Sequence, residues 1–378
     1  MKFVIAPDSF KESMTALVAA QAIQTGLLRA LPTAQCQLIP LADGGEGTVA
    51  TLVHAHQGEM VLTSTAGPLP GQMIQGAYGL IDNGKTAVIE VAAADGLTLV
   101  PRQQRDPLLT SSYGTGQQIL AALGRGVQRI IIGLGGSASV DGGLGILQAL
   151  GARCLDDQGQ PVPAGGQGLS QVATIDLSTI DPRLSQTELI LASDVTNPLL
   201  GPHGAAKVFG PQKGATPKMV ATLEAGMKNF ARRMTVTVGR DFSQAAGSGA
   251  AGGIGFALLV LGGQLQSGIE LMMAATNLSQ AIQAADLVIT GEGRIDGQTS
   301  FGKVPAGVAR LAKQAHKPLI AIGGSLGDDL SVLYDMGFTA IFACLGSVEP
   351  LDQVLVQGPA NLSRTAENIG RILLLESK

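Results

Sequence analysis

The sequence predicts an α/β protein of two domains, one of them assembled from both ends of the chain. Its 378 residues suffice for two domains of ordinary size. Short apolar runs alternate with helical patterns near both termini, which is typical of a parallel sheet covered by helices. A hairpin signal lies between them. We therefore expect one α/β domain from residues 1–65 and 271–378, with a mixed α/β domain inserted at 66–270.

The N-terminal part of the chain alternates strand and helix. Phe3–Pro7 is a short apolar run that ends in proline, as expected of a buried strand. Thr15–Leu31 carries apolar residues at helical spacing and stops before Pro32. We expect a second strand at Gln37–Leu41 and a second helix at Thr48–Gln57.

The last third of the chain repeats this alternation. A strand is expected at Asp286–Thr290, and the polar stretch after it reads as a loop that reaches Lys303. Pro305 favours the first turn of a helix, which we expect to end near Gln314. The further expected elements are strands at Pro318–Gly324 and Ala340–Leu345 and helices at Asp328–Asp335 and Asn361–Leu375.

The middle of the chain mixes strand directions. Met73–Ala94 holds two β-rich runs on either side of Asn83-Gly84, a strong hairpin signal. Arg129–Gly151 reads as strand, glycine-rich loop and helix, and Glu188–Leu199 as a strand that ends in a polar turn. Helices are expected at Thr216–Arg233 and Ala250–Leu261. A cleft between two such domains is where we expect a ligand.

The amino-acid composition argues against nucleic acid and membranes as partners. The net charge is −4, from 25 Lys and Arg against 29 Asp and Glu, so no basic surface for nucleic acid is expected. Aromatic residues make up only 3% and Trp is absent, which leaves few stacking platforms for bases. The N-terminal apolar run is too short for a signal peptide, and no stretch is long enough to span a membrane. We expect a cytoplasmic protein that acts on a small molecule.

Five loops that follow predicted strands combine glycine with charged residues. Ligands of α/β sheets gather at the carboxyl ends of strands, so these loops are the candidate site. One Gly-Asp loop alone is usually a turn, but five in one chain indicate more. The loops are Ala6–Ser13, Ala42–Thr48, Gly133–Gly143, Ser193–Ala215 and Thr290–Lys303.

The residue types in these loops suit phosphoryl transfer. Backbone N–H groups of glycine-rich loops can cradle phosphate oxygens. Lysine and arginine side chains can neutralise phosphate or a substrate carboxylate, and aspartates can hold Mg²⁺ or accept a hydroxyl proton. The candidate cations are Lys11, Lys207, Lys213, Arg294 and Lys303, and the candidate carboxylates are Asp8, Asp43, Asp141, Asp194 and Asp296.

Two glycine patterns resemble nucleotide motifs without the context that those motifs need. Gly297, Gly302 and Lys303 fit the first seven positions of a P-loop, but Val304 stands where Ser or Thr would hold Mg²⁺. Several residues also separate this match from the preceding strand. Gly247, Gly249 and Gly252 match the dinucleotide fingerprint, but no strand is predicted before them. We expect neither motif to be functional as such.

Six of these motifs in this order resemble the bacterial glycerate kinases of the type I family. They are IAPDSFKES, LADGGEGT, GLGGSASVDGG, FGPQKGAT, GSGAAGGIG and VITGEGRIDGQT. The similarity runs nearly end to end. It implies ATP-dependent phosphorylation of D-glycerate with Mg²⁺, 2-phosphoglycerate as the product, and a flavodoxin-like or Rossmann-like domain built from both termini. The family has no P-loop, which agrees with the interpretation of Gly297–Lys303.

On the basis of this resemblance, we predict a role for each candidate residue. Asp194, Asp296 and Lys11 are the predicted catalytic groups, and Asp194 and Asp296 the predicted metal ligands. The predicted substrate-binding residues are Asp8, Ser9, Lys11, Asp43, Gly44, Gly45 and Arg294. The predicted ATP-binding residues are Gly135, Gly136, Ser137, Lys207, Lys213, Gly249 and Lys303.

Three alternatives stay open at this point. The same kinase can give 3-phosphoglycerate, because rotating a three-carbon substrate exchanges its two hydroxyl groups. A non-catalytic sugar-acid-binding module needs no metal ligands near a phosphate loop. An NAD(P)-dependent dehydrogenase requires a dinucleotide fingerprint anchored on a strand. Whether the protein is a monomer or a homodimer is open as well.

Overall fold

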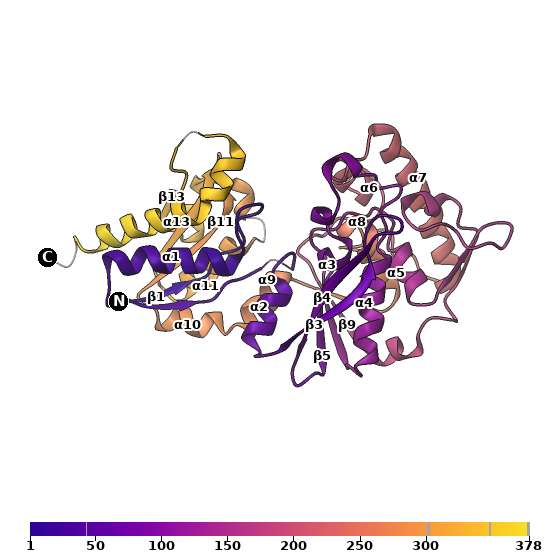
Figure 1. The fold of residues 1–378 in the computed structure, drawn as a ribbon, viewed down its shortest axis with the longest axis horizontal. Coiled ribbons are helices and arrows are strands. Elements are labelled where there is room, and N and C mark those ends of the chain that lie inside the picture. Colours follow the sequence, from indigo (N-terminus) through magenta and orange to yellow (C-terminus); the bar gives the residue numbers. More distant parts are fainter. Residues whose placement is uncertain (43, 301–302, 348, 376–378) are drawn as a thin grey trace. The chain divides into compact units, whose positions relative to one another are not determined.

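The protein is α/β throughout, and its contacts divide it into two units. The computed structural model describes residues 1–42, 44–300, 303–347 and 349–375. The terminal unit comprises residues 1–43 and 269–378, and the inserted unit comprises 44–268 (Figure 1). This division places residues 44–65, which we expected in the terminal domain, in the inserted unit. The reason is that strand β3 (Glu59–Ala66) pairs along its whole length with β4 (Met73–Ile81) of the inserted sheet.

The terminal unit is built on a five-stranded sheet in the order β13-β12-β11-β1-β2, with every pair parallel. Its strands are β1 (Lys2–Ile5), β2 (Gln35–Leu38), β11 (Leu287–Ile295), β12 (Leu319–Leu326) and β13 (Ala340–Ala343). Its helices are α1 (Ala16–Ala30), α9 (Gly268–Ala275), α10 (Leu278–Ala284), α11 (Val304–Gln314), α12 (Ser331–Met336) and α13 (Leu351–Leu373).

Helices cover both faces of this sheet. On one face α1 and α13 lie side by side and bury Ile23, Leu27 and Leu362 against Phe3 and Ile5 of β1 (Figure 1). Side chains alternate along a strand, so Val4 and Val288 point to the opposite face, where α10 and α11 contact the sheet. The strand order reverses between β1 and β11, so their carboxyl ends form the topological switch point where ligands of such sheets bind.

The inserted unit is built on a six-stranded mixed sheet in the order β10-β9-β6-β5-β4-β3. Its remaining strands are β5 (Thr86–Glu90), β6 (Arg129–Gly133), β9 (Glu188–Ala192), β10 (Gln264–Gln266) and the separate pair β7 (Arg153–Leu155) and β8 (Thr174–Asp176). Its helices are α2 (Thr48–Ala55), α3 (Ala92–Asp95), α4 (Tyr113–Gly124), α5 (Leu144–Ala149), α6 (Ala205–Phe209), α7 (Pro217–Val238) and α8 (Ala250–Val260) (Figure 1).

The predicted hairpin is present and makes this sheet mixed. Strands β4 and β5 are antiparallel, whereas β5, β6, β9 and β10 run parallel. Asp82, Asn83 and Gly84 have φ of 54°, 56° and 80°, the left-handed region that the Asn-Gly turn predicted. Tyr78, Ile89, Ile119 and other buried side chains form a core between the sheet and its helices.

Two expectations about elements were wrong. The stretch Gly291–Ile295, expected to be a loop, continues strand β11 because its residues keep pairing in register with Ile322–Leu326 of β12. Helix α13 begins at Leu351 rather than Asn361, and it tolerates Pro359 in its interior. Proline removes the N–H that would reach the Leu355 carbonyl. That carbonyl instead accepts a hydrogen bond from the Ser13 hydroxyl, at 2.6 Å.

None of the described helices combines the length and the apolar character needed to cross a bilayer.

Candidate active site

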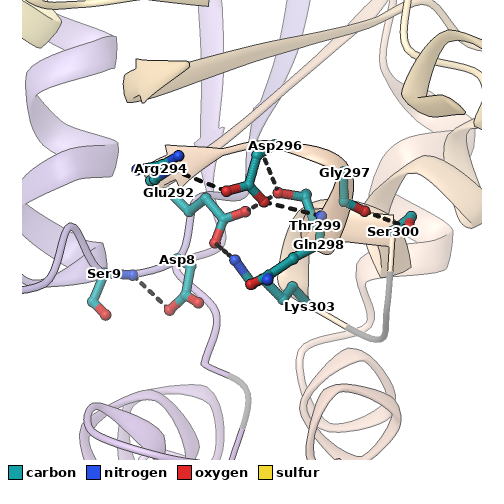
Figure 2. Close-up of polar contacts among 10 residues, drawn as sticks. All are labelled: Asp8, Ser9, Glu292, Arg294, Asp296, Gly297, Gln298, Thr299, Ser300 and Lys303. Carbon is teal, nitrogen blue, oxygen red and sulfur yellow. Dashed lines mark hydrogen bonds and ion pairs between the residues drawn. The ribbon is translucent and has the colours of Figure 1, made fainter. Parts of the chain in front are cut away.

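The switch point of the terminal unit gathers charged side chains from β1, β11 and the segment before α11. The loop after β1 stays attached to β11, because the Asp8 amide donates to the Gly291 carbonyl at 2.8 Å. This contact puts the buried Asp8 next to Glu292 of β11 (Figure 2). Ser9 donates its amide to Asp8 Oδ1, at 2.6 Å. Two predicted substrate-binding residues therefore lie at the switch point.

Glu292 is the central residue of this cluster, and the sequence analysis missed it. Its carboxylate is buried, accepts the Thr299 hydroxyl at Oε1 (2.6 Å), and pairs with the Lys303 ammonium at Oε2 (3.2 Å) (Figure 2). Burial raises the pKa of Glu292, and the hydrogen bond from Thr299 and the charge of Lys303 partly offset that rise. Its neighbours Gly291 and Gly293 made this stretch resemble a loop, so the inward-facing position was not recognised.

Lys303 stands at the start of α11. Its side chain is about one third exposed, at 34%, and reaches back to Glu292. Lys303 is the N-cap residue, with Val304 completely buried behind it and Pro305 in the first turn. A lysine ammonium carries three N–H donors and the start of a helix favours anions, so this position suits a phosphate group.

Asp296 and Arg294 hold the end of β11. Arg294 Nε donates to Asp296 Oδ2 at 3.0 Å, and Asp296 Oδ1 accepts the Gln298 amide at 2.9 Å (Figure 2). These bonds anchor the 3₁₀ turn Gly297–Ser300. Arg294 is largely exposed, so its guanidinium also has access to solvent and ligands.

The near-match to a P-loop has a different structure. A P-loop joins a strand directly to a helix, whereas here the strand runs to Ile295 and a 3₁₀ turn precedes α11. Val304 begins the helix with its side chain in the core, as expected. Gly302 lies outside the described residues. Lys303 therefore reaches the site from a helix start that differs from the P-loop arrangement.

In the inserted unit, the predicted glycines lie where backbone segments meet at the strand ends. Gly44 has φ of 85°, and a Cβ there would lie 2.6 Å from the Ala192 carbonyl oxygen at the end of β9. A Cβ on Gly135 would lie 2.3 Å from Gly45 Cα. The loop after β6 and the loop before α2 therefore pack backbone to backbone, and only glycine permits this contact. Asp43 lies outside the described residues.

Asp194 and Glu90 are carboxylates at the same strand ends. Asp194 follows β9, as predicted, and its Oδ1 accepts the Ser267 hydroxyl at 2.7 Å. Glu90 ends β5 and accepts the Val49 amide of α2 at 2.7 Å. Burial raises the pKa of Glu90 to about 7, the nearby Glu46 adds to the rise, and the bonds from Val49 and Gly47 oppose it. Glu90 was not predicted as a site residue.

Ser137 and Lys213, both predicted to bind ATP, meet in a buried network. Lys213 Nζ donates to Ser137 Oγ and to the Ser139 carbonyl, each at 2.7 Å. Burial lowers the pKa of Lys213 to about 8, although the charges of Asp95 and Asp141 favour its protonated form. Gly136, with φ of 70°, belongs to the same loop. Lys213 is only 3% exposed, so in this conformation it fixes the loop after β6 from within.

Two acidic residues complete this network. Asp95 accepts the amide and the hydroxyl of Ser139. Asp141 accepts the Ser112 hydroxyl at 2.8 Å and the amides of Ser112, Gly143 and Gly145. Burial raises the pKa of both carboxyls, and for Asp95 the charge of Asp141 adds to the effect. Asp141 therefore organises the start of α5.

The remaining two predicted ATP-binding residues lie outside this buried network. Lys207 is exposed on α6, whereas Lys213 is buried. Gly249 caps α8, where a Cβ would lie 2.2 Å from the Pro198 carbonyl oxygen. No strand precedes this glycine pattern, so it is a packing motif and not a dinucleotide fingerprint, as expected.

The fold and these strand-end clusters suit an α/β enzyme that handles an anionic substrate and transfers phosphate. Comparison with known proteins agrees: the model of the Glycerate kinase family matches residues 3–374. The chain belongs to the glycerate kinase family. It is 50% identical to the glycerate kinase of Haemophilus influenzae over 99% of both chains. It is also 47% identical to the glycerate 2-kinase of Escherichia coli, over 99% of this chain and 98% of the relative.

A solved structure shares the whole architecture. The crystal structure of a glycerate kinase 2 from Salmonella typhimurium LT2 superposes with a TM-score of 0.84 at 48% identity. The match covers 100% of this chain and 99% of the other. The expected family, fold class and phosphotransferase activity are thereby confirmed.

Proposed function

We propose that the protein transfers the γ-phosphoryl group of ATP to the 2-hydroxyl of D-glycerate, with Mg²⁺ as the metal. The observation that carries this proposal is the pair of the buried Glu292 with Lys303, beside Asp8 at the switch point of the terminal sheet (Figure 2). A parallel sheet binds ligands at that place, and the cluster supplies both cations for phosphate and carboxylates for a metal or a proton. The name of the Escherichia coli relative, glycerate 2-kinase, supports phosphorylation at the 2-position.

Each charged residue has a proposed task. Lys303 and the exposed Arg294 bind anionic oxygens, and Glu292 keeps Lys303 oriented. Lys11, exposed in the loop after β1, binds the substrate carboxylate or a phosphate. Asp8 and Ser9 present polar atoms to the substrate from the same loop. In the inserted unit, Gly135, Gly136 and Ser137 form the loop that we propose contacts the nucleotide.

The carboxylates of the protein can bind Mg²⁺ even though they do not supply all of its ligands. Among the described residues, no three His, Cys, Asp or Glu side chains gather into a metal-binding group. Mg²⁺ usually takes one or two carboxylates and completes its octahedron with phosphate oxygens and water, so single carboxylates suffice. Asp194 and Asp296 stay the proposed ligands. The ion would neutralise charge on the transferred phosphoryl group.

An assay of nucleotide consumption tests the proposed reaction. Purified protein with ATP and Mg²⁺ is expected to release ADP only when D-glycerate is present. L-Glycerate is the matched control for substrate handedness. ADP release that does not depend on glycerate, or glycerate binding without any turnover, would contradict the proposal and favour a hydrolase or a binding module.

A further inference from the structure

A pocket of about 320 Å³ opens at the carboxyl edge of the terminal sheet, and the charged cluster does not fill it. Its walls come from the loop after β1, the end of β13 and the first turns of α13. They are mostly apolar, and the pocket lies at the lower end of the size range of small-molecule sites. The apolar lining residues are Phe10, Met14, Leu345, Leu351, Val354 and Leu355.

Two glycines from neighbouring strands line this pocket. Gly293 of β11 and Gly324 of β12 lie across from each other, since Glu292 pairs with Gly323 and Arg294 with Ser325. A Cβ on Gly324 would lie 2.5 Å from the Gly293 carbonyl oxygen. At these two glycines no side chain covers the surface of the strands. Glycine inside a strand marks a place where a ligand or another backbone approaches closely, and here the two strands themselves approach each other at Gly324.

The pocket and the charged cluster lie at the same carboxyl edge of the sheet, on opposite faces of β11. Gly293 lies between Glu292 and Arg294, and side chains alternate along a strand, so the pocket is on the α13 face and the Glu292–Lys303 pair is on the α11 face. Lys11 also lines the pocket, so a cation stands at its edge. A ligand that has an apolar part in the pocket would therefore place its anionic part beside Lys11, at the carboxyl edge that both faces of the sheet share.

The wall formed by α13 is held in place. Ser13 donates to the Leu355 carbonyl, which Pro359 leaves without its helical partner. The loop after β1 is thus fastened to the helix turn that carries Val354 and Leu355. Asn361, buried on the same helix, adds a carboxamide to the lining.

We propose that this pocket binds the purine base of the nucleoside triphosphate, an assignment that rests on the proposed kinase function. A base is planar, with apolar faces that suit bare backbone and aliphatic walls and with polar edges that suit Asn361 and Ser325. D-Glycerate has three carbons, all bearing oxygen, and would gain nothing from apolar walls. The phosphates of the same nucleotide then extend from the pocket past Lys11, over the carboxyl edge of the sheet.

Methyl NMR tests the position of the base directly. The probe is protein labelled with ¹³C at the methionine methyl groups, with the Met14 signal assigned by Met14→Leu. Adenosine and ADP are both expected to shift the Met14 methyl, because an aromatic ring beside it changes its local field, whereas inorganic triphosphate should leave it in place. If ADP binds and glycerate is phosphorylated while the Met14 signal does not move, the pocket assignment is overturned and the kinase function stands.

A pair of variants on α13 gives a second, independent test. Val354→Phe fills the pocket, whereas Val356→Phe adds the same ring at a position that is 83% exposed and outside the pocket. Val354→Phe is expected to weaken ADP binding at least tenfold by calorimetry, with the KM for glycerate unchanged, and Val356→Phe to stay within twofold of the wild type. Equal effects of the two variants would overturn the assignment. If the wild type neither binds ADP nor releases it from ATP, the pocket and the proposed function fail together.

Discussion

At the scale of single residues, Glu292 ties the site together, because it is buried, acidic and paired with a cation. Its oxygens hold Thr299 and Lys303, and the pair lies beside Asp8. We expect Glu292→Gln to lower kcat at least ~100-fold, the usual scale for loss of a positioned acid, base or metal contact. Gln is nearly isosteric, so the melting temperature should change little.

A matched control for this variant lies on the surface of the same unit. Glu367 is partly exposed and pairs with the exposed Arg371 and Arg29, and pairs that are open to solvent contribute little. Glu367→Gln should leave kcat within twofold of the wild type. Near-normal turnover by a folded Glu292→Gln protein would show that the pair with Lys303 is structural only.

Glu90 gives a pH-dependent prediction. Its pKa is raised from 4.5 to about 7, so the folded state binds a proton more tightly than the unfolded state does. Stability associated with this group is present below pH 4.5 and is lost as the pH rises to about 7. Gln keeps an acceptor for the Val49 amide and has no charge to bury.

Glu90→Gln should therefore gain stability relative to the wild type between pH 5 and pH 8, by about 2–3 kcal/mol. Urea unfolding at both pH values, followed by a probe in the inserted unit, measures this change. A stability difference that stays constant with pH, or that grows in the opposite direction, would refute the raised pKa.

At the scale of elements, most strands and helices were predictable because each carries its own periodicity. The asparagine-glycine hairpin predicted antiparallel strands in the middle of the chain. The alternation of strands and helices at both chain ends predicted a parallel sheet. β11 was predicted to end at Thr290, because Gly291 and Gly293 resemble loop residues; pairing with β12 keeps the strand extended, and this tertiary contact has no local signal. Glu292 was missed for the same reason. Asp8, Ser9, Arg294, Asp296 and Lys303 were candidates because polar and charged residues follow the predicted strands there, and their site roles stay predictions.

A substitution at the start of α11 is expected to change the stability of the protein and not its dependence on Mg²⁺. Val304 is completely buried at the first helical position. Val304→Thr would put a hydroxyl among apolar neighbours and cost on the order of 1–3 kcal/mol. We expect a lower melting temperature with an unchanged Mg²⁺ dependence. Val332→Thr, on the exposed side of α12, is the control and should not lower it. Tighter apparent Mg²⁺ binding in Val304→Thr would support a degenerate P-loop instead.

The contact between Ser13 and α13 predicts a coupling between two positions. Ser13→Ala leaves the Leu355 carbonyl without its donor and should cost about 1–3 kcal/mol. In a Pro359→Ala background the restored N–H can bond to the same carbonyl, so the cost of Ser13→Ala should fall. A double-mutant cycle measured by denaturant unfolding gives the interaction free energy. Strictly additive effects would show that Ser13 does not replace the missing helical bond.

At the scale of the whole molecule, the chain matches one family from residue 3 to residue 374. The reaction proposed for it is phosphorylation of D-glycerate by ATP at the 2-hydroxyl. Proton-coupled ³¹P NMR of the product tests this claim most directly, because the carbon at position 2 carries one proton and the carbon at position 3 carries two. The account predicts a doublet from a phosphate beside one proton, formed only with ATP and D-glycerate together. A triplet would identify 3-phosphoglycerate, and the absence of any phosphate ester signal would contradict the kinase reaction itself.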